Sequence, residues 1–145
     1  MNKQSWLKQI DHLREVLFGM GYVLCEATDV EDSVHFQERE VHINSRQHPE
    51  TRFYTILHEL GHIMVAENSD TFSADVPMYV HSHTMPNDGR RERGKAYRVS
   101  LVAEEIEAWK LGRRFAIAQG LWVDNEKYNK HMTDAVMSYI EWSAV

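Results

Sequence analysis

Hydrophobic residues recur at helical spacing in four segments of this 145-residue chain. In each segment the apolar positions fall three or four residues apart, which predicts a helix with one buried face. Glycines after the first segment and around residue 120 are typical helix stop signals, and Asp124 is a candidate N-cap. The predicted helices are Trp6 to Met20, Pro49 to Met64, Arg98 to Gln119, and Asp124 to Trp142.

Three short segments between the first two predicted helices have strand character, at residues 22–26, 33–37 and 40–44. In the last segment, Val41 and Ile43 alternate with polar neighbours, as in a strand with one buried face. Glu38-Arg39 would form the turn between the second and third segments. We therefore expect a small antiparallel sheet that leads directly into the next helix, and an α+β fold.

His58, Glu59 and His62 form an H-E-x-x-H motif inside the second predicted helix. Residues four apart share a helical face, so both imidazoles can reach one metal ion. Zinc held by three protein ligands activates a bound water for hydrolysis, and the intervening glutamate can accept its proton. Gly61 costs about 1 kcal/mol in a helix interior, which suggests that another backbone approaches there. The alternative is a solvated pair of helix histidines with an exposed glutamate.

Glu105 is the preferred third ligand, because it places a carboxylate in an apolar stripe of the third predicted helix. A buried carboxylate needs a partner, and a metal ion is a strong one. We expect Glu104 and Glu107 to face water or basic neighbours on the same helix. His81 and His83 are alternative third ligands, since residues two apart on a strand point the same way. A histidine third ligand would correspond to an SprT-like metalloprotease.

Residues 68–97 show no sustained period and contain two of the three prolines. This composition predicts a long loop, and long loops in compact domains are usually functional. Because the segment joins the two helices that carry the candidate ligands, we expect it to be mobile without substrate and to lie over the cleft.

Length and composition limit the other possibilities. A chain of 145 residues predicts one domain, residues 1–145, and no apolar run is long enough to cross a membrane. The N-terminus lacks the apolar core of a signal peptide, so we expect a cytoplasmic protein. A net charge of −6 makes direct nucleic-acid binding an unfavoured function, and Arg90–Lys95 is interpreted as a solvated loop. Cys25 is predicted to be a buried small hydrophobic residue, and the histidines outside these candidate sites, among them His35, His42 and His131, to lie on the surface or on a strand face.

Three segments together resemble the ImmA/IrrE family of zinc metallopeptidases: Val41–Asn44, Arg52–His62 and Glu105–Ala108. The resemblance implies a zincin-like, gluzincin-type fold in which His58, His62 and Glu105 bind zinc and Glu59 is the general base. It also implies a repressor-type transcription factor as substrate, often encoded nearby in a phage or mobile element. Trp109 stands where the family usually has Asn or Asp, so a hydrogen bond to a zinc-bound histidine is lost or replaced.

The leading hypothesis is a zinc-dependent metallopeptidase that hydrolyses peptide bonds of a protein partner. We expect the strand at residues 40–44 to pair with an extended substrate. Tyr79, His81, His83 and Tyr97 are candidates for the group that stabilises the oxyanion or contacts substrate. The alternatives are a non-cleaving binding or scaffold protein with a zincin fold, and a zinc hydrolase that acts on a small molecule.

Overall fold

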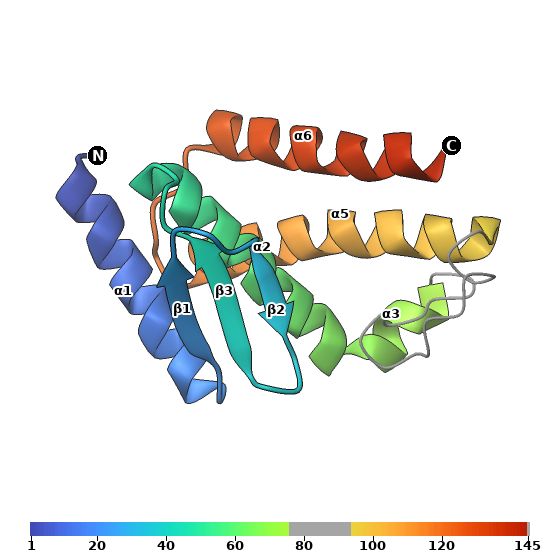
Figure 1. Cartoon of the computed structure of the whole chain (residues 1–145), viewed down its shortest axis with the longest axis horizontal. Coiled ribbons are helices and arrows are strands. Elements are labelled where there is room, and N and C mark those ends of the chain that lie inside the picture. The colour runs from blue at the N-terminus through green and yellow to red at the C-terminus, as the bar shows by residue number, and fades with distance from the viewer. Residues whose placement is uncertain (76–93, 145) are drawn as a thin grey trace.

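The computed structural model describes residues 1–75 and 94–144 of the chain (Figure 1). It confirms an α+β fold, with helices packed behind a small sheet. The elements are α1 (Lys3–Gly19), β1 (Val23–Ala27), β2 (Ser33–His35), β3 (Glu40–Asn44), α2 (Pro49–Glu67), α3 (Ser69–Asp75), α5 (Lys95–Ala118) and α6 (Asn125–Ser143). None of the described helices is long and apolar enough to cross a membrane.

The sheet is mixed, with strand order β1-β3-β2. β2 and β3 pair antiparallel, as the predicted turn at Glu38-Arg39 requires, but β1 pairs parallel with β3. The prediction of a wholly antiparallel sheet was therefore wrong. A local turn signal reveals only the hairpin, whereas the parallel pairing of β1 with β3 has no local sequence signal.

α2 lies at the centre of the molecule, between the sheet and α5 (Figure 1). His48 caps it by accepting a hydrogen bond from the Glu50 backbone N–H at 3.3 Å, and Pro49 occupies its first turn. The predicted apolar stripe forms the core: its fully buried members are Phe53, Ile56, Leu57, Leu60 and Ile63. The opposite face of α2, which carries the two motif histidines, is left to line a cleft.

Two glycines bring the backbones of α2 and α5 into direct contact. A Cβ on Gly61 would lie 1.9 Å from the carbonyl oxygen of Ala108, and one on Gly112 would lie 2.4 Å from the carbonyl oxygen of Leu57. No side chain fits at either position without separating the helices. The expectation that another backbone approaches Gly61 is confirmed.

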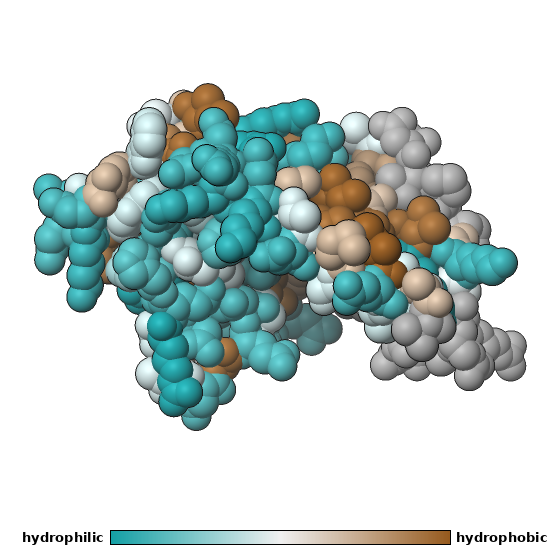
Figure 2. Space-filling model, turned by 90° about the horizontal axis from the view of Figure 1, so that it is seen from above, coloured by the Kyte–Doolittle hydropathy of each residue, from teal (hydrophilic) through white to brown (hydrophobic). Residues whose placement is uncertain are grey.

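α6 packs on α5, anchored by the fully buried Tyr128, whose hydroxyl donates a hydrogen bond to the carbonyl oxygen of Trp109. Figure 2 looks down on the side of the molecule that α6 forms, and hydrophobic side chains gather toward its right-hand half. Met137 and Ile140, in the C-terminal half of α6, remain 45% and 40% exposed. Tyr128 thus anchors the first turns of α6, while Ala135 and Tyr139 farther along the helix line the cleft.

The prediction of one loop over residues 68–97 was wrong at both ends. Residues 69–75 form the short helix α3, and residues 95–97 belong to the first turn of α5. The polar Ser69–Asp75 segment has too few apolar positions to show a helical period. The remainder of the predicted loop, residues 76–93, lies outside the described residues.

Candidate metal centre and cleft

His58, His62 and Glu105 meet between α2 and α5, and we call this group the helix centre. The two histidine Nε2 atoms are 3.0 Å apart. The Glu105 carboxylate oxygens lie 2.6 Å from Nε2 of His58 and 3.2 Å from Nε2 of His62. Ligands of a tetrahedral zinc ion are separated by roughly 3 to 3.5 Å, given metal–ligand bonds near 2.0 Å. Two nitrogens and one carboxylate, all aimed at one point, therefore fit a zinc ion with an open fourth position.

Because His58 and Glu105 are buried together, the charge of each affects the pKa of the other. Burial disfavours the imidazolium of His58, but the carboxylates of Glu59 and Glu105 outweigh that effect and raise its pKa to about 10. Burial likewise disfavours the Glu105 carboxylate, yet hydrogen bonds from His58 and His62 lower its pKa to about 2. Without metal, the helix centre is thus held together by the contacts of His58 and His62 with Glu105, in which the ligand atoms already point inward.

Glu59 lies beside the helix centre and is 5% exposed. Its carboxylate is 3.4 Å from Nδ1 of His58, the ring nitrogen that points away from the cluster. Because it also lines the cleft, it can reach a water there while remaining mostly shielded from bulk solvent. This is a suitable position for a proton acceptor.

Glu104 does not face water, so this expectation was wrong. It is 8% exposed, lines the cleft, and lies 3.9 Å from Nδ1 of His62. α5 is covered by α2 on one side and α6 on another, so two adjacent positions are buried rather than one stripe. Glu107 instead pairs with Lys110 at 3.7 Å, as expected.

Trp109 takes the place of the smaller polar residue that the resemblance led us to expect. Its ring stacks on His58 with centroids 4.3 Å apart and an interplanar angle of 12°. Its indole N–H donates a hydrogen bond to Glu105 at 3.3 Å. One side chain therefore orients two members of the helix centre, although neither contact is a hydrogen bond to a histidine.

The helix centre lies in a cleft of about 600 Å³. One wall is the β2 segment, where Asp32, Ser33, Val34 and Phe36 line the cleft. Asp32 accepts hydrogen bonds from the Asn44 backbone N–H at 2.7 Å and from the Gln47 amide at 2.9 Å. Burial raises the pKa of the Asp32 carboxyl. These contacts hold the start of β2 against the end of β3 and the link from β3 to α2.

The opposite wall is α6, which presents His131, Ala135 and Tyr139 to the cleft. Partial burial raises the pKa of the Tyr139 hydroxyl, and the nearby carboxylates of Glu105 and Glu59 raise it further. Tyr139 therefore remains a hydrogen-bond donor at neutral pH. Sequence reasoning missed Tyr139 and assigned His131 to the surface, although with Tyr128 their spacing marks a single helical face.

Of the other predicted contact residues, the structure describes only Tyr97, and it is not brought to the cleft. Tyr97 lies in the first turn of α5, two turns before Glu105, and is not among the cleft-lining residues. Tyr79, His81 and His83 lie outside the described residues.

A family model described as the IrrE N-terminal-like domain, from a family of peptidases, matches residues 22–106. This range begins just before β1 and ends just after Glu105, so it includes the sheet, α2 and all members of the helix centre. A comparison with curated proteins and one with solved structures gave no match. α1, the second half of α5, and all of α6 lie outside the matched range.

Proposed function

Because the chain belongs to the IrrE N-terminal-like family of metallopeptidases, we propose that it is a zinc-dependent peptidase that cleaves a protein partner. The observation that carries this proposal is the meeting of His58, His62 and Glu105 beside the shielded carboxylate of Glu59, inside an open cleft. A structural zinc site would be closed by a fourth protein ligand, whereas the residues that the structure describes offer three here.

In this proposal His58 and His62 give their Nε2 atoms to zinc, and Glu105 gives its carboxylate. When bound, zinc supplies a Lewis acid and lowers the pKa of a water molecule to about 7. Trp109 keeps His58 and Glu105 in place by stacking and by its indole N–H. Glu104, near Nδ1 of His62, orients the second imidazole.

Glu59 accepts a proton from the attacking water and returns it to the nitrogen of the departing amine. Tyr139 donates a hydrogen bond to the carbonyl oxygen of the scissile bond as negative charge develops on it. This role for Tyr139 is supported by its place in the lining of the cleft, together with Glu59 and Glu105. It replaces Tyr97 as the preferred oxyanion residue among those described.

The substrate strand is proposed to bind along β2. The expectation that residues 40–44 pair with substrate is replaced, because β3 is the central strand: β1 pairs with Glu40–Asn44 and β2 pairs with Glu40–His42. β2 is an edge strand in the described sheet, and its residues border the cleft. A strand edge beside a hydrolytic centre recognises extended backbone, which favours a peptide over a small molecule.

A repressor-type transcription factor is the substrate class that the resemblance to ImmA/IrrE proteins supports. A net charge of −6 on this chain does not favour direct contact with DNA. The protein partner, rather than this chain, would therefore supply any DNA-binding function.

The test compares the zinc-loaded wild type with Glu59→Gln, on a peptide library and on the regulator encoded beside the gene. Glu59→Gln keeps the shape of the side chain but removes its proton acceptor. We expect it to retain fold, zinc and partner binding, while cleavage falls by about a hundredfold or more. Glu107→Gln is the matched control, since Glu107 pairs with Lys110 away from the centre, and it should cleave normally.

The result that overturns the proposal is equally specific. If wild type and Glu59→Gln bind the regulator equally, and neither cuts it nor any library peptide, the protein is a binding scaffold with a zincin fold.

A further inference from the structure

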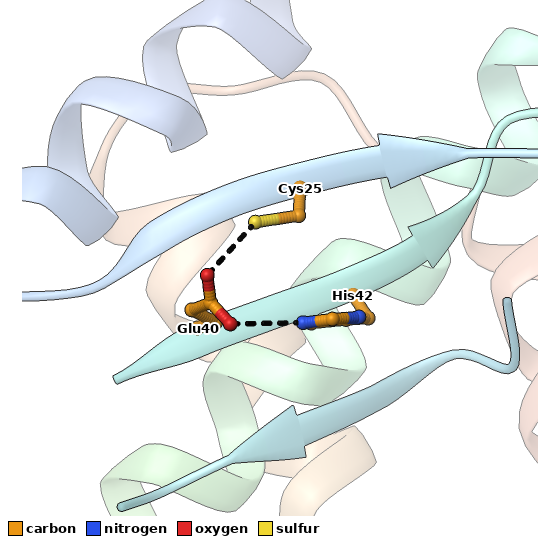
Figure 3. A group of neighbouring side chains, drawn as sticks. All are labelled: Cys25, Glu40 and His42. Carbon is orange, nitrogen blue, oxygen red and sulfur yellow. Dashed lines mark hydrogen bonds and ion pairs between the residues drawn. The ribbon is translucent and has the colours of Figure 1, made fainter. Parts of the chain in front are cut away.

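The outer face of the sheet carries a second group of metal-binding side chains, separate from the cleft. It consists of Cys25 on β1 with Glu40 and His42 on β3, and we call it the sheet cluster (Figure 3). No described helix covers this face (Figure 1). On β3, Val41 and Ile43 alternate with Glu40 and His42 and are fully buried on the inner face. The sheet cluster and the helix centre are thus on opposite sides of the sheet and cannot share an ion.

Strand pairing brings the three side chains together. Cys25 is paired with His42 in the parallel β1–β3 ladder, so their side chains point to the same face. Glu40 lies two residues before His42 on β3 and also projects to that face. Figure 3 shows the Glu40 carboxylate directed toward both neighbours.

The distances suit a small divalent ion. Sγ of Cys25 is 3.6 Å from Oε2 of Glu40, and Nε2 of His42 is 3.3 Å from Oε1 of Glu40. The three ligating atoms all lie within 4.8 Å of one another. With zinc–sulfur bonds near 2.3 Å and zinc–nitrogen or zinc–oxygen bonds near 2.0 Å, ligands of a tetrahedral ion are about 3.3 to 3.6 Å apart. Small movements of the three side chains toward one another would bring all their ligating atoms within these distances.

A neighbouring histidine supports the arrangement. The ring of His35, on β2, lies 4.1 Å from the ring of His42 at an interplanar angle of 30°. Its Nε2 is 3.1 Å from the hydroxyl of Ser33, which orients it. The contact with His35 supports the plane of the His42 ring, and the contact with Glu40 keeps Nε2 of His42 toward the cluster.

We propose that Cys25, Glu40 and His42 bind one zinc ion on the outer face of the sheet. One sulfur, one nitrogen and one oxygen form a donor set of intermediate softness, which suits zinc better than magnesium or calcium. Binding replaces the thiol proton of Cys25, so one proton is released as the sulfur–zinc bond forms. Three protein ligands leave one position for water or an external donor. The ion would join β1 to β3, and it does not depend on the function proposed for the cleft.

The prediction that Cys25 is a buried hydrophobic residue was wrong, because its side chain is partly exposed on the outer face. Burial, together with the Glu40 carboxylate, raises the pKa of its thiol. In the absence of metal the thiol is therefore protonated and donates to Glu40, and a cation must compete with that proton.

Cobalt(II) titration of the whole, metal-free, reduced protein tests the site. Cys25 is the only cysteine in the chain, so a thiolate-to-cobalt charge-transfer band in the near ultraviolet reports this site alone. We expect the band to saturate at one cobalt per chain at the sheet cluster and to disappear when zinc is added. His42→Gln and Glu40→Gln should weaken cobalt binding at least tenfold, and Cys25→Ser should abolish the band. His58→Ala, in the helix centre, is the matched control and should leave the band unchanged.

Three results would overturn the proposal. One is a folded wild type that develops no band at millimolar cobalt. Another is a band whose affinity is the same in His42→Gln and Glu40→Gln as in the wild type, because Cys25 would then bind without its neighbours. A band whose intensity per chain rises with protein concentration would also count against it, since that dependence indicates a thiolate shared between two chains. A rise in the melting temperature with zinc that is lost in Cys25→Ser would support the link between β1 and β3 independently of the spectrum.

Discussion

The helix centre and the sheet cluster each present three metal-binding side chains, but in opposite surroundings. Glu105 is 2% exposed, and its buried carboxylate is stabilised by contacts of both its oxygens with the two histidines. All members of the sheet cluster are partly exposed, and water can solvate each of them. The difference teaches that burial, rather than the number of donors, determines how strongly a metal-free site is held in its binding geometry.

The two groups are also built on different supports. The helix centre depends on one helical repeat in α2 and on the close contact between α2 and α5. The sheet cluster depends on the register between β1 and β3. A change that moves α2 away from α5 should therefore affect the helix centre and leave the sheet cluster unchanged. A change in the pairing of β1 with β3 should do the opposite.

The largest effect is expected from Gly61→Ala. Its new Cβ would lie 1.9 Å from the Ala108 carbonyl oxygen, so α2 and α5 must move apart. We expect the free energy of unfolding to fall by about 3 kcal/mol or more, the upper end for overpacking in a core. Denaturant unfolding measures the change. Gly19→Ala is the control, because its new Cβ would meet nothing within 4 Å. This substitution should not lower the free energy of unfolding. Equal stability of both variants would show that the helix contact is not tight.

A matched pair of glutamate substitutions compares the groups directly. Glu105→Ala should lower zinc affinity at the helix centre by more than about a hundredfold, beyond the loss typical of residues that only support a ligand. It should leave the thiolate–cobalt band of Cys25 intact. Glu40→Ala should weaken metal binding at the sheet cluster and leave zinc affinity at the helix centre intact. The loss of affinity should be smaller than that in Glu105→Ala, because water can replace an exposed ligand. Full zinc retention by Glu105→Ala, with loss in His81→Ala or His83→Ala, would favour the SprT-like alternative.

Tyr139→Phe removes one hydroxyl from the cleft wall. We expect kcat to fall by about ten- to a hundredfold with little change in KM, because the hydrogen bond strengthens only as the oxyanion forms. Steady-state kinetics on a library-selected peptide provides the measurement. Tyr97→Phe is the control and should retain kcat. A greater loss of kcat in Tyr97→Phe than in Tyr139→Phe would instead favour Tyr97, one of the candidates predicted from the sequence.

Trp109→Phe should have the smallest effect. Phenylalanine keeps an aromatic ring against His58 but cannot donate to Glu105. We expect zinc affinity to fall by roughly tenfold, at the lower end for a residue that supports a ligand. Competition with a chromophoric chelator measures it. Trp122→Phe, at an indole that is 55% exposed, should bind zinc like the wild type. No difference between the two variants would mean that the indole N–H does not support Glu105.

Much of α2 could be predicted because its information is local. The apolar period, Pro49 in the first turn, and Gly61 each have a physical meaning within a few residues. The same locality places His58 and His62 on one face from their spacing alone. Glu105 could be selected because a carboxylate in an apolar stripe needs compensation.

Other features depend on contacts distant in sequence. The parallel pairing of β1 places Cys25 beside His42, seventeen positions later, and no local pattern encodes that register. The burial of Glu104 follows from α5 being covered on two sides. Tyr139 lies 34 positions after Glu105, and a helical stripe alone does not say which element it will face. These errors are of one kind, since each required the position of a second element.

The contact at Gly61 and Gly112 also determines which parts of this protein can change. Main-chain atoms, rather than side chains, set the separation of α2 and α5, so substitutions elsewhere cannot easily alter the distance between Glu105 and the histidines. The walls formed by β2 and α6 carry no such constraint. Selection for new substrates, in nature or in the laboratory, should therefore accumulate changes in those walls while both glycines stay invariant.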